Sequence, residues 1–370
     1  MQDNSATKSN HRHVAELCKK ARFFLKEKKF NSAIEFFQKA LEHEENNVYA
    51  LTGLGDVERT RQNFKEAVDY YQRVIDVENN NLFALRGLGD SLRGAREYQP
   101  AIHAWEKYLA QRPDDVHVLT RIADAYKQLE NFDISEKIYI RSIALNPRDV
   151  YSIMGLADLY HKTHRADEAI LYYDKVLEIS GNYVHVLTMV GNLYREKKEF
   201  EKARSYYERT LELDENNAYA LFGLGNIYRW ERDYQKAIQV WEKILLHQEG
   251  TDTMLARLAD AYQNVGRIED AEKTYSDILK QGYHRDALIG QTKLLISQGK
   301  DSEALDGYRK HLKNNEQDGQ VIDEFGLFLS NLGCTDPLRS SFLKTKELFG
   351  ENSIAGLAIT AFLNQMDNAH

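Results

Sequence analysis

The chain has 370 residues, of which 42% are hydrophobic and 29% are charged. This balance is typical of a folded protein and excludes an intrinsically disordered one. The net charge is −8 at pH 7, with acidic and basic residues interspersed, which argues against a nucleic-acid-binding protein because such proteins need a basic surface. Only four prolines occur, so helix is expected throughout.

The first segment, residues 1–13, is polar, and we expect it to be disordered. It has no apolar centre, so it is neither a signal peptide nor a membrane anchor. No apolar run approaches the roughly 18 residues that a membrane-spanning helix needs, so we expect no membrane insertion. Cys18 and Cys334 lie outside any Cys-x-x-Cys spacing and are expected to be reduced thiols. These features predict a cytoplasmic protein, provided that no leader has been removed.

A period of 34 residues runs through the chain. A small residue recurs at this spacing, and a second small residue recurs 12 positions after each of them. The first row reads Gly55, Gly89, Ala123, Ala157, Gly191, Gly225 and Ala259, and the second reads Ala67, Ala101, Ser135, Ala169, Ala203, Ala237 and Ala271. Apolar positions within each repeat follow the helical period in two segments. Each repeat is therefore a helix hairpin that must stack on its neighbours to bury its apolar stripe.

Counted from Val48 as position 1, the repeats carry small residues at positions 8 and 20, an aromatic residue at 24 and, in most of them, an aromatic residue at 11. One repeat shows this pattern as Gly225, Ala237, Tyr228 and Trp241, and Pro113 and Pro147 stand at position 32 of two others. The pattern resembles the tetratricopeptide repeat family. The resemblance implies an all-α fold, a right-handed superhelical α-solenoid of about nine helix hairpins. The expected repeats are 14–47, 48–81, 82–115, 116–149, 150–183, 184–217, 218–251, 252–284 and 285–318.

The last part of the chain departs from the pattern. Residues 319–363 are expected to form a degenerate repeat and capping helices, and residues 364–370 a flexible tail. The apolar tract at 353–363 is expected either to cap its own array or to dock on a second copy of the chain.

No motif for catalysis is found. Gly53 and Gly55 stand inside the first helix of a hairpin, with no preceding strand, so they do not form a phosphate-binding loop. Gly53 costs the helix about 1 kcal/mol relative to alanine, and we expect it to relieve crowding between neighbouring helices. His161 and His164 are spaced like a metal pair but lack further ligands. We therefore expect no enzyme activity, no cofactor and no metal.

The face of the first helix opposite the core is the expected binding surface, because packing does not dictate its residues. In the family that the chain resembles, this face lines a concave groove that holds partner segments. Position 2 is mostly aromatic, position 9 is Asp or Asn, and position 12 is mostly basic. The predicted contacts are Tyr49, Phe83, Tyr151 and Tyr219 in the aromatic row, Asp56, Asp90, Asp124, Asp158, Asn192 and Asn226 in the Asp/Asn row, and Arg59, Arg93, Arg195 and Arg229 in the basic row.

The repeat 218–251 has the strongest signature of an interface, because Phe222 and Trp230 join its groove face and exposed Trp beside Arg is typical of binding hot spots. Asn192 and Asn226 are further candidates for hydrogen bonds to a peptide backbone. The alternative is that the charged rows are structural, since Asp and Arg three residues apart pair on a helix for about 0.2–0.5 kcal/mol.

The sequence thus predicts a non-catalytic scaffold that binds a protein or peptide partner along its groove. The two-carboxylate clamp known from some family members is absent, since no repeat has Asn at position 6. The second hypothesis is homo-oligomerisation through the C-terminal helices.

Overall fold

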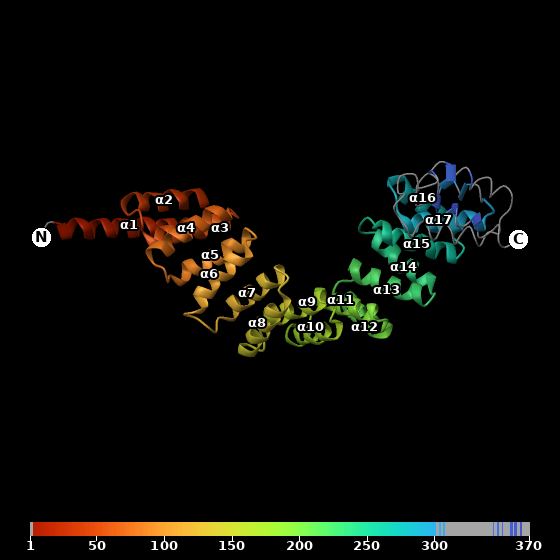
Figure 1. The fold of residues 1–370 in the computed structure, drawn as a ribbon, viewed down its shortest axis with the longest axis horizontal. Helices are drawn as coiled ribbons and strands as arrows, with labels where there is room; N and C mark the ends of the chain where they lie inside the picture. The colour runs from red at the N-terminus through yellow and green to blue at the C-terminus, as the bar shows by residue number, and fades with distance from the viewer. Residues whose placement is uncertain are drawn as a thin grey trace. The chain divides into compact units, whose positions relative to one another are not determined.

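The computed structural model describes residues 3–300 and residues 303, 304, 306, 307, 343, 346, 347, 350, 356, 357, 359, 360, 363 and 364. The chain divides into two compact bodies, Met1–Val186 and Leu187–His370, called here the N-terminal and C-terminal bodies. No residue in the described part lies in a strand, so the all-α prediction is confirmed (Figure 1). The helices are α1 Asp3–Lys26, α2 Phe30–His43, α3 Val48–Thr60, α4 Phe64–Val77, α5 Leu82–Gly94, α6 Tyr98–Leu109, α7 Val116–Gln128, α8 Phe132–Leu145, α9 Val150–Lys162, α10 Ala166–Ser180, α11 Val184–Glu196, α12 Phe200–Leu213, α13 Ala218–Trp230, α14 Tyr234–Leu245, α15 Asp252–Asn264, α16 Ile268–Gln281 and α17 Arg285–Ser297.

Each repeat is a hairpin of two antiparallel helices, and successive hairpins pack side by side in each body (Figure 1). The first helices of the repeats begin at position 1, starting with α3 at Val48 and α5 at Leu82. The residue just before them is an N-cap, because its side chain accepts a hydrogen bond from the amide three residues on and satisfies a free helix donor. These caps are Asn47, Asn81, Asp115, Asp149, Asn217, Thr251 and His284.

Position 15 ends the turn of each hairpin in the left-handed conformation. Gly266 and Gly299 hold this position in two repeats, as the low cost of a positive φ in glycine would suggest. The other repeats place a side chain there, which costs about 1–2 kcal/mol. These residues are Lys28, Gln62, Arg96, Glu130, His164, Lys198 and Arg232.

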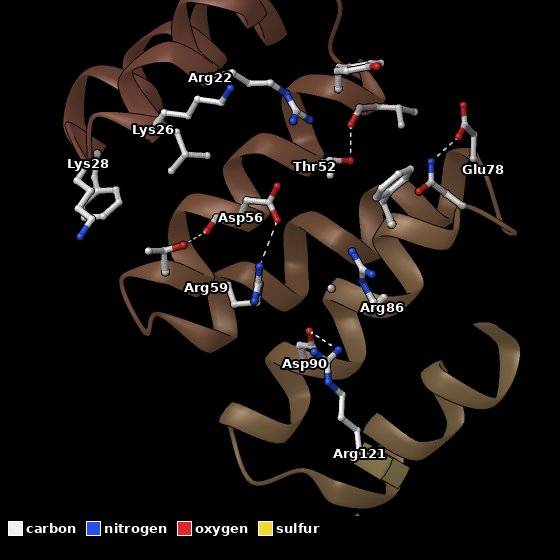
Figure 2. Close-up of a pocket in the computed structure, with 18 residues that line it drawn as sticks. Arg22, Lys26, Lys28, Thr52, Asp56, Arg59, Glu78, Arg86, Asp90 and Arg121 are labelled. Atoms are coloured by element: carbon white, nitrogen blue, oxygen red, sulfur yellow. Dashed lines mark hydrogen bonds and ion pairs between the residues drawn. The ribbon is translucent and has the colours of Figure 1, made fainter. Parts of the chain in front are cut away.

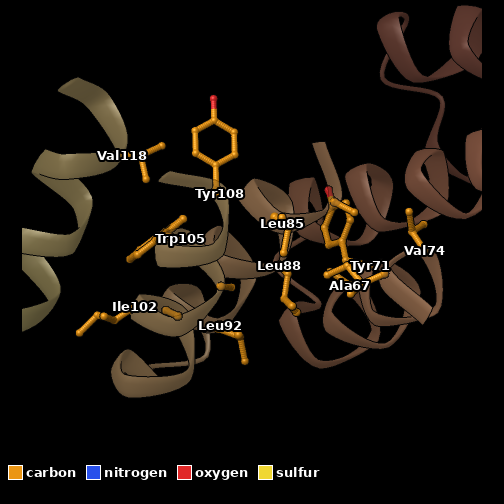
Figure 3. Close-up of a cluster of buried hydrophobic side chains, with 14 of the residues drawn as sticks. Ala67, Tyr71, Val74, Leu85, Leu88, Leu92, Ile102, Trp105, Tyr108 and Val118 are labelled. Atoms are coloured by element: carbon orange, nitrogen blue, oxygen red, sulfur yellow. The ribbon is translucent and has the colours of Figure 1, made fainter. Parts of the chain in front are cut away.

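A buried aromatic ring at position 24 is the centre of each hairpin and contacts two neighbouring first helices. Tyr71 is fully buried and lies in the same cluster as Leu85 and Leu88 (Figure 3). A Cβ atom on Gly55 of its own repeat would come within 2.9 Å of the ring, and one on Gly87 of the next repeat within 2.5 Å. The expectation that the extra glycine relieves crowding between helices therefore has a specific cause: the two glycines make room for one ring.

Repeats with tyrosine at position 24 and repeats with tryptophan there differ in the hydrogen bonds of the ring. In four repeats with tyrosine, the hydroxyl donates to the Asp or Asn at position 9 of the same repeat, as Tyr71 does to Asp56 at 2.7 Å. Where the ring is tryptophan, as in Trp105, the indole Nε1 is buried without a hydrogen-bond partner among the described residues. Position 6 of the next repeat is then arginine instead of glycine. Arg121 donates to both carboxylate oxygens of Asp90, at 2.8 and 3.0 Å.

The N-terminal segment differs from the prediction, because α1 extends back to Asp3 and makes most of residues 1–13 helical. The reason is contact with the second helix of the hairpin. Asn10 Nδ2 lies 3.5 Å from the carbonyl oxygen of His43, and the rings of His13 and His43 meet edge to face at 5.0 Å. The predictions for residues 319–363 and for the tail fall almost wholly outside the described residues.

Candidate functional site

An open groove of about 1070 Å³ runs across the first helices of four successive repeats in the N-terminal body. Its walls come from α1, α3, α5 and α7 (Figure 2). This is the face opposite the ring-packed core, because most groove residues of the first helices stand at positions 2, 5, 6, 9 and 12. The groove thus lies where the sequence places the binding surface.

Basic side chains dominate the groove although the whole chain is acidic. The basic residues that line it are Arg22, Lys26, Lys28, Arg59, Arg86 and Arg121, and the acidic ones are Asp56, Glu78 and Asp90. Each acid is already bound within the chain: Asp56 by Tyr71, Glu78 by Asn81 and Asp90 by Arg121. The acids are therefore used by the fold, and the groove keeps a positive potential for a ligand.

Several cations of the groove, Arg86 and Arg22 among them, are left available by this network. Arg86 is exposed and forms no hydrogen bond or ion pair with the other residues of the groove (Figure 2). Arg22 lies over the ring of Tyr49, with 5.3 Å between the guanidinium carbon and the ring centroid. Neither side chain has a carboxylate partner in the groove, so both can pair with an acidic ligand.

The aromatic row of the prediction is exposed to solvent. Tyr49, Phe83, Tyr151 and Tyr219 are between 66% and 74% exposed. Tyr49 and Phe83 line the groove, whereas Tyr151 and Tyr219 hold the same register position elsewhere in the array. Large exposed rings at a fixed register position are unusual on a surface without a binding role, because burial of each would release on the order of 2 kcal/mol.

The predicted Asp/Asn row has a structural role in the hairpins. Asp124 accepts from Tyr139, Asp158 from Tyr173 at 2.6 Å, and Asn192 from Tyr207 at 2.7 Å. Burial, followed by the nearby carboxylate, raises the pKa of Tyr139 and Tyr173. These three side chains have partners on the second helices of their hairpins, which is a different pairing from the Asp and Arg three residues apart that the structural alternative expects.

Asn226 is the clearest case in this row. It is 3% exposed, its Nδ2 donates to the carbonyl of Phe222 at 2.7 Å, and its Oδ1 accepts from Arg257 at 2.5 Å. Both ends of the amide are engaged, so Asn226 does not offer hydrogen bonds to a peptide backbone.

The arginines of the basic row differ in how closely they are paired with carboxylates. Arg59 lies 3.6 Å from Asp56 on its own helix, as expected for a structural pair, and Arg93 is exposed. In the C-terminal body, Arg195 lies 3.9 Å from the exposed Glu196 and Arg229 lies 3.8 Å from Asp260. These separations leave the arginines of the C-terminal body only weakly paired.

Trp230 is 59% exposed, as its predicted role requires. Its ring lies 5.9 Å from that of Phe200, and the ammonium of Lys198 is 5.6 Å from its centroid. Phe222 is half-buried, with the Arg257 guanidinium 5.3 Å from its ring. Both aromatic side chains are therefore flanked by cations.

Five of the groove cations, Lys28 among them, were not among the predicted residues. Arg22 and Lys26 belong to the repeat 14–47, where Arg22 stands at position 9 and replaces the usual Asp. Extending the position 9 row to this repeat would have found it. Arg86 and Arg121 stand at positions 5 and 6, which lie beside the three rows, and Arg121 interrupts the glycines that recur at position 6.

The described residues hold no group of three or more His, Cys, Asp or Glu side chains that could bind a metal ion. No helix in the described part is both long and apolar enough to cross a membrane.

Three models of the tetratricopeptide repeat match the chain: one at residues 149–216, one at 18–80, 189–250 and 256–319, and one at 116–149. The second alone spans about half of the chain. The chain belongs to the tetratricopeptide repeat family.

No curated protein matches the sequence. Among solved structures, the C-terminal part of a tetratricopeptide repeat protein from Cytophaga hutchinsonii is 17% identical, with a TM-score of 0.57, and the match covers 64% of this chain and 98% of that one. A tetratricopeptide repeat protein from Parabacteroides merdae is 19% identical, with a TM-score of 0.50 and coverage of 68% and 99%. At these identities the likeness establishes the α-solenoid fold alone.

Proposed function

We propose that the protein is a non-catalytic scaffold that binds an extended, acidic segment of a protein partner in the groove of the N-terminal body. The observation that carries the proposal is the combination of unpaired cations, Arg22 and Arg86, with the exposed rings of Tyr49 and Phe83 in one groove.

The shape of the groove favours a chain-like ligand. It crosses four successive first helices, and its two exposed rings stand one repeat apart, on α3 and α5. An extended peptide that follows the repeats meets a ring and then a cation in each of these hairpins. Aromatic residues and arginine provide large contact areas at modest entropic cost, which is why they concentrate in protein interfaces.

The charge of the groove favours acidic side chains in the ligand. Arg86 and Arg22 have no carboxylate partner in the groove, so an incoming carboxylate gains a charge-assisted hydrogen bond without breaking one. The same potential would attract an acidic segment from a distance and make association salt-dependent.

Binding to arrays of acidic peptides with and without an aromatic residue tests the proposal, using the full chain. The double variant Phe83→Ala/Arg86→Gln should weaken capture by about tenfold or more, equivalent to about 1.4 kcal/mol. Tyr151→Ala is the matched control, because Tyr151 has the register position and exposure of Phe83 but does not line the groove.

The proposal fails if the wild-type chain captures no acidic peptide, or if Phe83→Ala/Arg86→Gln captures the same peptides with unchanged affinity. Circular dichroism melting of each variant distinguishes a lost contact from a lost fold.

A further inference from the structure

Between residues 48 and 284, the residue at position 9 changes from aspartate to asparagine at one place only. Position 9 is aspartate in five of the seven repeats between 48 and 284 and asparagine in the two adjacent repeats 184–217 and 218–251. The two asparagines, Asn192 and Asn226, therefore remove two negative charges from neighbouring helices, α11 and α13 of the C-terminal body.

Three arginines gather where these charges are missing. Arg195 follows Asn192 on α11, Arg229 follows Asn226 on α13, and Arg257 on α15 donates to Asn226. Burial lowers the pKa of Arg257, and the charges of Arg229 and Arg195 lower it further. Arg257 contacts Asn226, one helical turn before Arg229, and Arg195 holds the register position of Arg229 in the preceding repeat, so the three positive charges belong to one face.

Three carboxylates act on these arginines, but none of them accepts a hydrogen bond from the three guanidinium groups among the described residues. Asp260 lies 3.8 Å from Arg229, Glu196 lies 3.9 Å from Arg195 and is mostly in solvent, and Asp286 acts on Arg257 from α17. The Nε atoms of Arg195 and Arg229 are buried and have no hydrogen-bond acceptor among the described residues. A buried donor without an acceptor is unfavourable, and an added anion would relieve the repulsion among the guanidinium groups.

The equivalent residues of the N-terminal body indicate that a carboxylate fits beside Arg257. There the same register positions hold Asp90 and Arg121, and the carboxylate of Asp90 binds the guanidinium at 2.8 and 3.0 Å. At the equivalent place in the C-terminal body, Arg257 finds a neutral amide. The fold thus supplies the carboxylate itself in one body and omits it in the other.

We propose that Arg195, Arg229 and Arg257 form a second binding site, which takes a carboxylate side chain from an acidic segment of a protein partner. Phe222 and Tyr219 lie on the same helix as Arg229 and offer apolar contact beside the charge. This site does not depend on the groove of the N-terminal body, and each has its own variants.

The test measures binding of a fluorescein-labelled octaglutamate peptide to the full chain at low salt, by anisotropy. Asn192→Asp/Asn226→Asp restores the two carboxylates that other repeats carry, so the fold should tolerate it. We expect this variant to lose about tenfold or more in affinity at the second site. The control variant Asn216→Asp/Gln248→Glu adds the same two charges at exposed positions and should bind like the wild type.

Phe83→Ala/Arg86→Gln separates the two sites. If the arginine site exists, this variant keeps the part of the binding that Asn192→Asp/Asn226→Asp removes. The second site is overturned if Asn192→Asp/Asn226→Asp binds the peptide as the wild type does, if its loss equals that of the charge control, or if the wild type does not bind the peptide. Arg257→Gln provides an independent variant should the double variant fail to fold.

Inorganic phosphate distinguishes a carboxylate site from a general anion site. Phosphate at low millimolar concentration should displace the peptide only weakly. Strong binding of phosphate without binding of octaglutamate would overturn the carboxylate assignment.

Discussion

Gly87 packs directly on the ring of Tyr71 in the preceding repeat, so close that a Cβ atom there would lie 2.5 Å from ring atom Cζ. Gly155 has the same relation to Tyr139, and Gly223 has it to Tyr207. Stacking of one repeat on the next therefore depends on a backbone-to-ring contact that only glycine permits. In a repeat array such interfaces carry much of the stability, because each hairpin alone is marginal.

Gly87→Ala should accordingly destabilise the protein although alanine is the better helix former. The helix gains about 1 kcal/mol in propensity, but overpacking against the fully buried Tyr71 costs about 1–3 kcal/mol, so we expect a net loss near 1 kcal/mol. Urea unfolding followed by circular dichroism measures it. Arg93→Ala, an exposed change on the same helix, should stay within about 0.5 kcal/mol. A stabilised Gly87→Ala variant would contradict the packing argument.

Arg96→Gly should stabilise the protein. Arg96 has a φ of 64°, in the left-handed region that costs a residue with a side chain about 1–2 kcal/mol. Glycine removes this cost but loses about 0.4–1 kcal/mol through the entropy of the unfolded chain, so a gain of about 0.5 kcal/mol is expected. Gly266→Ala, at the equivalent position with a φ of 81°, should shift the unfolding midpoint in the opposite direction. Shifts of the same sign would show that the turn conformation is not the cause.

The pair of Asp90 and Arg121 should show strong coupling in a double-mutant cycle. The side chain of Asp90 is 12% exposed, so Arg121→Gln leaves a largely buried carboxylate without its cation and should cost about 2 kcal/mol. Adding Asp90→Asn reproduces the neutral amide of the repeat 218–251 and should recover much of that loss. Additive effects of the two changes would mean that the ion pair does not join the two repeats.

Tyr173 should make stability depend on pH at alkaline values. Burial, followed by the charge of Asp158 and the hydrogen bond to it, raises the pKa of Tyr173. A folded-state pKa above the unfolded value near 10 means that this contribution is complete below about pH 10 and is lost as the pH rises further. Tyr173→Phe should therefore lose less stability than the wild type between about pH 9 and 11. Parallel curves for the two proteins would rule out this linkage.

The sequence predicts the repeats and their packing positions well, because the rows of small and aromatic residues are periodic and local. It also contains a signal that periodicity does not use: Asn or Asp directly before the first helix, as in Asn47, Asn81 and Asp115, which are the caps of the structure. The left-handed turn at position 15 leaves no such signal, since five different residue types with side chains occupy it in seven repeats.

The use of the groove residues was harder to predict, because it depends on contacts between helices. Asp56 and Arg59 have the spacing of a surface ion pair, yet Asp56 accepts its shorter bond from Tyr71, 15 residues away on the second helix. Asn226 lies on the predicted face but is buried by Arg257 of the next repeat. The repeat pattern places a residue in its row, whereas its partner depends on the neighbouring hairpin.

The two kinds of repeat also restrict how the array could have lengthened or shortened. Tryptophan at position 24 is followed by arginine at position 6 of the next repeat, as Trp105 is by Arg121, and the tyrosines that pack on a following glycine form the other kind. Removal of residues 116–149 would keep the 34-residue register but bring Trp105 before Gly155 and leave Asp90 without a cation. Duplication or loss of a single hairpin would therefore destabilise the array unless the residues at positions 24 and 6 of the new neighbours still match. The unit that must be kept together in evolution is thus the junction between two hairpins.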